Sequence, residues 1–172
     1  MEILIPGLIL VALMVWLSTR IKRNAAAAFD AERIETEDLI VEKPEGFLHV
    51  LNDDSGLLFR AYSKDFGTVG RRDTRQATIE VERHRGSTLD EAVAAAKGVA
   101  ETFTSEIPYT EGGERAVDAR STRIRDGGEF EIIHKFVTRG SDVIEARGAV
   151  LTENRDEHMS DIEQAIGTLR IR

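Results

Sequence analysis

The feature that most constrains this chain is a run of apolar residues close to its N-terminus. Ile3 to Leu17 contains no charged side chain, and twelve of its fifteen residues are Leu, Ile, Val, Met or Trp. A helix of that length covers about 22 Å of a hydrocarbon core about 30 Å thick, and the neighbouring residues extend it. The run therefore predicts a transmembrane helix over residues 1–20. The expected anchoring residues are Ile3, Leu10, Trp16, Arg20, Lys22 and Arg23.

Two other interpretations of the apolar run remain open. A cleaved signal peptide begins with basic residues, whereas this chain begins Met1-Glu2, and Arg20 to Arg23 separate the run from the cleavage-like Ala25 to Ala28. A core helix on a domain surface carries a polar stripe, which the run lacks. Because basic residues flank only the C-terminal end, a retained span has its N-terminus outside and its main domain in the cytoplasm. We therefore expect a single-pass protein of the bacterial inner membrane.

Composition excludes several classes of function. With 172 residues, the chain has the length of one domain plus an appendage. It has no cysteine, which excludes disulfides, thiolate metal sites and cysteine nucleophiles. Its 23 basic and 31 acidic residues give a net charge of −8, which disfavours binding to nucleic acid.

The pattern changes beyond the apolar run. Residues 21–37 are rich in alanine and predict a helical stalk that continues the membrane helix. Residues 38–172 predict one α+β domain, with turn signals such as Asp126-Gly127-Gly128 between extended segments. The expected strands lie at 39–41, 47–51, 57–63, 77–85, 115–125, 129–139 and 143–151.

Two amphipathic helices complete the predicted domain. Thr88 and Glu91 form a capping-box pattern at the start of a helix that is expected to end before Pro108. Asn154 is the expected N-cap of a closing helix that extends to Ile171. Small residues such as Gly148 in the strand over 143–151 allow a helix to approach closely. The short hairpin links predict an antiparallel sheet of about six strands covered by the two helices.

This order of elements resembles the PsbP-like fold, which is shared by an extrinsic subunit of photosystem II, a yeast import factor that binds Ran, and the bacterial DcrB proteins. The resemblance covers residues 38–172. Its supporting residues are Pro44-Glu45-Gly46-Phe47, Ala61-Tyr62-Ser63, the capped helix from Thr88, and Ile166 to Ile171. It implies an α/β/α sandwich that acts as a binding or assembly module on membrane complexes. No catalytic motif or cofactor follows from it.

The four histidines do not form a metal-binding motif. His49, His84, His134 and His158 are at least 24 residues apart in the sequence, whereas a zinc site on one helix needs close spacing. His134 alternates with Ile132 and Phe136, which predicts a hydrogen-bonded histidine in the core or at its edge. Several strands can still bring histidines together in space. We expect no metal ion.

Motifs for catalysis and for nucleotide binding are also absent from the sequence. Ser63, Ser87 and Ser121 lack the Gly-x-Ser-x-Gly elbow of many serine hydrolases. The segment from Gly67 to Arg72 lacks the spacing and the Gly-Lys-Ser/Thr ending of a phosphate loop. We therefore predict no catalytic residues, no cofactor and no enzymatic activity.

Basic residues cluster unevenly for an acidic chain. Arg71, Arg72 and Arg75 lie in a predicted loop, and Arg83 and Arg85 end the following strand. Next to an anionic leaflet, each cation adds about 1 kcal/mol of attraction, so this cluster is a candidate contact for a lipid headgroup or an acidic partner. Alternatively, the arginines only solvate a strand surface.

The leading functional hypothesis is a membrane-anchored module that binds protein, as an accessory or assembly subunit of a membrane complex. Its expected partners are the bilayer, through the N-terminal helix, and one protein of that complex. The alternative is a carrier or sensor that holds an apolar or lipid-like ligand in a cleft between sheet and helix. Titratable groups gathered in one cleft would favour an enzyme, and a flat exposed apolar patch would favour protein binding.

Overall fold

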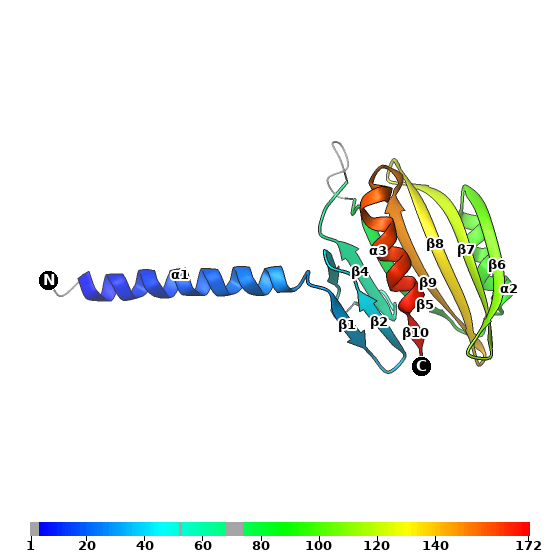
Figure 1. The fold of residues 1–172 in the computed structure, drawn as a ribbon, viewed down its shortest axis with the longest axis horizontal. Helices are drawn as coiled ribbons and strands as arrows, with labels where there is room; N and C mark the ends of the chain where they lie inside the picture. The colour runs from blue at the N-terminus through cyan, green and yellow to red at the C-terminus, as the bar shows by residue number, and fades with distance from the viewer. Residues whose placement is uncertain (1–3, 52, 68–73) are drawn as a thin grey trace.

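A long N-terminal helix projects away from the folded domain (Figure 1). The computed structural model describes residues 4–51, 53–67 and 74–172. The predicted helix is present as α1, Leu4–Ala27. No helix in these described ranges is both long and apolar enough to cross a membrane, so the predicted transmembrane span is not supported by the structure.

The predicted helical stalk is wrong beyond Ala27. Glu32–Glu35 form strand β1, which pairs antiparallel with β2, Leu39–Lys43. The reason is burial, because Ile34 is the only buried residue of β1 and packs in the main core. Residues Arg170–Ile171 form strand β10 on the other edge of β2, where the sequence predicted the end of the closing helix.

Within the part of the chain that the structure describes, the main sheet has seven strands rather than about six. All neighbouring strands are antiparallel, in the order β3-β4-β5-β9-β8-β7-β6. The strands are β3 Phe47–His49, β4 Phe59–Ser63, β5 Ala77–His84, β6 Thr102–Glu111, β7 Glu114–Arg125, β8 Gly128–Arg139 and β9 Asp142–Leu151.

The additional strand is β6, whose residues 102–107 fall within the predicted helix. Helix α2, Leu89–Val99, ends well before Pro108, because Ala100 already has an extended backbone. From Thr102 onward the chain pairs with β7. Pro108 is tolerated within β6 because this strand lies at the edge of the sheet, where one row of backbone groups has no partner strand.

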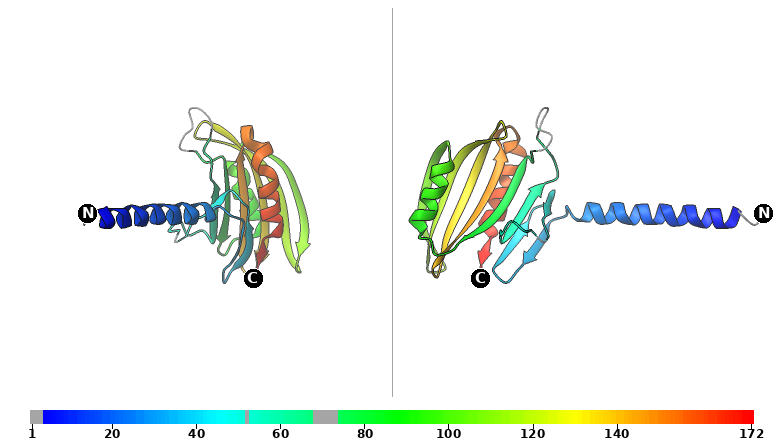
Figure 2. Two further views of the ribbon diagram at one scale, coloured as in Figure 1. Left: turned by 60° about the vertical axis from the view of Figure 1, so that its left-hand side comes forward. Right: turned by 180° about the vertical axis from the view of Figure 1, so that it is seen from behind.

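The two predicted helices cover opposite faces of the sheet (Figure 2). Helix α2 begins with the predicted capping box of Thr88 and Glu91 and packs on Phe136 and Val143. Helix α3, Arg155–Thr168, packs on the opposite face with the small sheet of β1, β2 and β10. The 3-10 helix η1, Thr152–Asn154, precedes α3, and the side chain of Asn154 makes none of the expected capping hydrogen bonds.

Close packing at Gly148 confirms the prediction for β9. An added Cβ atom at Gly148 would lie 2.1 Å from Cγ2 of Ile162 and 2.9 Å from Cδ1 of Ile166. Both isoleucines belong to α3 and are buried in the main core. The position therefore requires glycine for steric reasons.

A buried lysine links α1 to the domain. The Nζ atom of Lys43 donates hydrogen bonds to the carbonyl oxygens of Phe47, at 2.8 Å, and Asp30. It also lies 3.4 Å from the carbonyl oxygen of Ala28, just beyond the end of α1. Desolvation lowers the pKa of Lys43, although Glu32 and Asp30 oppose this effect. The ammonium group thus holds the turn after α1 against the start of β3.

Candidate functional site

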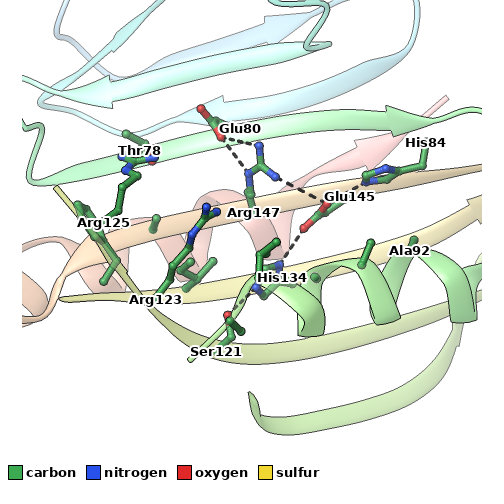
Figure 3. Close-up of a pocket in the computed structure, with 17 residues that line it drawn as sticks. Thr78, Glu80, His84, Ala92, Ser121, Arg123, Arg125, His134, Glu145 and Arg147 are labelled. Atoms are coloured by element: carbon green, nitrogen blue, oxygen red, sulfur yellow. Dashed lines mark hydrogen bonds and ion pairs between the residues drawn. The ribbon is translucent and has the colours of Figure 1, made fainter. Parts of the chain in front are cut away.

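A pocket lies between α2 and the face of the main sheet that α2 covers (Figure 3). Its volume is about 210 Å³, the space of roughly seven water molecules. One wall is apolar and comes from α2 and the residue after it, and strands β5, β7, β8 and β9 supply the polar floor. The wall residues are Ala92, Ala95, Ala96, Val99 and Ala100, and the polar floor includes Thr78, Glu80, His84, Ser121, His134, Glu145 and Arg147.

Strand alternation explains why these polar side chains share one face. Residues two apart in a strand point the same way, and paired residues on neighbouring strands lie side by side. Glu80 pairs with Arg147, and Arg147 pairs with His134. Ser121 pairs with Ile132, which puts its hydroxyl diagonally next to His134.

A continuous chain of hydrogen bonds crosses the floor of the pocket. Ser121 Oγ lies 2.8 Å from His134 Nε2, and His134 Nδ1 lies 2.8 Å from Glu145 Oε1. The other carboxylate oxygen of Glu145 lies 2.8 Å from His84 Nε2. Ser121, His134 and Glu145 are only 3%, 5% and 4% exposed, so these bonds are largely shielded from competing water.

The charge of Glu145 fixes the direction of these hydrogen bonds. Burial disfavours the carboxylate, but hydrogen bonds from His134 and His84 outweigh this effect and lower the pKa of Glu145 to about 2. The hydrogen bond to Glu145 raises the pKa of His84. Because an ionised carboxylate only accepts, Nδ1–H of His134 donates to Glu145, and Nε2 of His134 faces the hydroxyl of Ser121.

Three arginines give the pocket positive charge. Arg147 is committed to the floor, because its Nε lies 2.9 Å from Glu80 Oε2. Arg125 is exposed, pairs with Asp126 at 3.5 Å and lies over the ring of Phe130. Arg123 is also exposed and, within the described ranges, forms no hydrogen bond or ion pair. Its guanidinium group is therefore available to a ligand.

A metal ion fits this site poorly. Glu82, His84 and Glu145 have ligand atoms within 4.8 Å of one another. However, the guanidinium nitrogens of Arg147 lie 3.5 Å from Glu82 and 3.9 Å from Glu145. Because Arg147 holds a fixed positive charge next to these carboxylates, it weakens their attraction for a second cation.

The described members of the predicted arginine cluster do not share one surface. Arg75 precedes β5 and donates hydrogen bonds to the carbonyl oxygens of Ser63 and Lys64 at 3.1 and 2.9 Å. Arg83 and Arg85 lie at the other end of β5, about 26 Å away along eight residues of strand. Arg83 pairs with Asp38 at 2.5 Å, and Arg85 is exposed. Arg71 and Arg72 lie outside the described residues.

The histidine predictions have different outcomes. His134 is confirmed as a buried, hydrogen-bonded histidine, and His84 joins it through Glu145. His49 stacks on Phe59, and Nε2 of His158 lies 2.9 Å from the side-chain oxygen of Gln76. Ser121 belongs to the site although it lacks an elbow motif, and Glu145 belongs to it although no sequence motif marks this residue.

The fold of this chain is similar to that of solved structures. No family model and no curated protein matches the chain. The crystal structure of LpqN, involved in cell envelope biogenesis of Mycobacterium tuberculosis, matches with a TM-score of 0.59 and 10% identity, over 83% of this chain and 90% of LpqN. The solution structure of cyanobacterial PsbP (CyanoP) from Synechocystis matches with a TM-score of 0.57 and 12% identity, over 84% of this chain and 94% of CyanoP. The chain therefore has the PsbP-like fold.

Proposed function

We propose that this chain is a binding module that holds a short acyl group with an anionic end in the pocket beneath α2. The observation that carries the proposal is the exposed, unpartnered guanidinium of Arg123 beside an alanine-rich wall. This is the sheet–helix cleft of the carrier-or-sensor hypothesis. A carboxylate on Arg123 would form a charge-assisted hydrogen bond, and the hydrocarbon chain would lie against α2.

The size of the pocket limits the ligand. Sites for drug-sized molecules usually have about 300–1,000 Å³, and this pocket has about 210 Å³. Full-length lipid chains exceed that volume. Short carboxylates such as hexanoate match this volume better. We therefore narrow the expected apolar or lipid-like ligand to a short acyl compound.

Blocking the pocket should abolish binding of hexanoate. Ala95 lines the pocket, so Ala95→Phe fills it, whereas the exposed Ala94 on the same helix does not line it and supplies the control Ala94→Phe. We expect isothermal titration to show hexanoate binding to the wild type and the control, no binding to Ala95→Phe, and at least about tenfold weaker binding to Arg123→Gln. Equal affinity for all four proteins would contradict the proposal.

We further propose that α1 holds the module at the bacterial inner membrane, with the main domain in the cytoplasm. The support is a set of large apolar side chains on α1 that are all exposed: Val11, Leu13, Met14, Val15, Trp16, Leu17 and Ile21. Seven exposed large apolar side chains on one helix favour contact of that helix with lipid.

The orientation has a direct test. A reporter fused after Arg172 that is active only outside the cytoplasm should remain inactive, while a reporter that is active only inside should work. The opposite pattern would contradict the proposed topology. Recovery of the whole chain in the soluble fraction, without detergent, would contradict the anchor.

Protein binding remains a second proposal. Edge strand β6 has ten residues and one row of backbone groups without a partner strand, which is a template for pairing with another chain. Exposed large apolar residues outside α1 are spread over separate elements in the described ranges, at Leu51, Phe66, Val99, Ile107 and Ile124. This scattered distribution favours ligand binding in the pocket over protein binding through one broad apolar face.

A further inference from the structure

We infer that Ser121, His134 and Glu145 form a nucleophilic centre that hydrolyses short-chain acyl esters. The inference rests on the proposed function, since the acyl group occupies the same pocket. Its basis is the order of contacts: a hydroxyl on one ring nitrogen of a histidine, and a carboxylate on the other nitrogen, both at 2.8 Å. Nucleophile, base and orienting carboxylate are connected in this way in serine hydrolases of unrelated folds.

The three side chains have distinct roles. Glu145 is a positioning residue, because its pairing with Nδ1–H leaves Nε2 of His134 free to accept the proton of Ser121. Neighbouring strands β7, β8 and β9 supply one residue each, and their ladder hydrogen bonds fix the spacing. All three residues line the pocket, so the buried Ser121 is open to an occupant of that pocket (Figure 3).

Arg123 is the side chain that we assign to stabilise the negative charge that develops during attack. It lies two residues after Ser121 in β7 and lines the same pocket. Backbone N–H groups of β7 do not serve this purpose, because β7 pairs with a strand on each side. The guanidinium of Arg123 replaces the usual pair of backbone donors as the partner of the oxyanion.

The reaction requires only an ester and water. Ser121 Oγ bonds to the ester carbonyl carbon while its proton passes to His134 Nε2, and the carbonyl oxygen becomes an oxyanion beside Arg123. The bond from that carbon to the alcohol oxygen then breaks, and His134 gives its proton to the departing alkoxide. A water molecule attacks the acyl-serine and His134 takes one of its protons. That proton passes to Oγ as the bond between Oγ and the acyl carbon breaks, and the carboxylic acid leaves and loses its remaining proton to solvent.

The test compares labelling, turnover and binding in the full-length protein. A fluorophosphonate probe should modify Ser121, identified by mass spectrometry of the labelled peptide. p-Nitrophenyl butyrate should be hydrolysed with a kcat/KM about 100-fold or more above that of Ser121→Ala. The matched control is Ser63→Ala, because Ser63 is equally buried but contacts backbone groups of Asp65 and Ala77 rather than a histidine.

Two further variants separate catalysis from folding and from binding. Ser121→Cys should react with iodoacetamide at pH 7 at least about tenfold faster than a free cysteine, because His134 favours the thiolate. Glu145→Asp should restore part of the turnover that Glu145→Gln loses. Ser121→Ala should still bind hexanoate, because it lacks only the nucleophile. A wild type that binds hexanoate without hydrolysing the ester would contradict the nucleophilic centre and leave the proposed binding function standing. No labelling of Ser121, or equal turnover by wild type and Ser121→Ala, would overturn the inference.

Discussion

Replacing Gly148 with alanine should lower the free energy of unfolding by about 2–3 kcal/mol. The new methyl group would lie 2.1 Å from Cγ2 of Ile162, a fully buried side chain, so α3 must shift or Ile162 must leave its rotamer. Urea denaturation monitored by circular dichroism measures the change. The midpoint should fall while the slope stays constant.

The matched control is Gly98→Ala in α2. An added Cβ atom at Gly98 has no neighbour within 4 Å, and alanine favours helix by up to about 1 kcal/mol. This variant should therefore be as stable as the wild type or more so. In an Ile162→Ala background, Gly148→Ala should cost much less, because the nearer of the two clashing atoms is gone and only the end of the Ile166 side chain must move. An additive cost in the double variant would refute the steric explanation.

Replacing Glu145 with glutamine should remove about 3 kcal/mol of stability at pH 6. The pKa of Glu145 is about 2 in the folded protein against an ordinary value of 4.5, and each pKa unit is worth about 1.4 kcal/mol. A lowered carboxyl pKa stabilises the fold fully above pH 4.5, and this stability is lost as the pH falls through about 2. His84 has a raised pKa, so its contribution is complete below pH 6.5 and is lost as the pH rises through the raised value.

The contribution of this network to the stability of the wild type should therefore be largest between about pH 4.5 and 6.5. Chemical denaturation at a series of pH values gives the profile. In Glu145→Gln the profile should be flatter on both sides of that window. Glu106→Gln, which removes only a surface partner of Lys97, should leave the profile unchanged. Parallel profiles for the wild type and Glu145→Gln would contradict this account of the network.

Local sequence patterns were sufficient to predict a strand where one of its two faces is buried. The alternation in residues 77–85 predicted β5 within one residue, because each second side chain enters the core. Strand β6 was not predictable in this way. Ala100 and Phe103 fit the helical spacing that begins at Leu89, and only pairing with β7 makes Thr102–Glu111 a strand.

The candidate site depends on register, which local patterns do not report. Asp126-Gly127 is a tight turn with positive φ at both residues, and it sets Ala119 opposite His134. The next turn sets Arg147 opposite His134 and hence Glu145 diagonal to it. Had the pairing been followed through both hairpins, Ser121, His134 and Glu145 would have emerged as neighbours.

The central claim is that ligand binds in the pocket beneath α2, and nuclear Overhauser contacts from bound hexanoate test it most directly. Our account predicts contacts from the hexanoate methylene protons to the methyl groups of Ala95 and Ala96, with a shifted Nε–H resonance for Arg123. Contacts confined to the groove beside α3 that is lined by Ile107 and Tyr109, with no change at Arg123, would contradict the account.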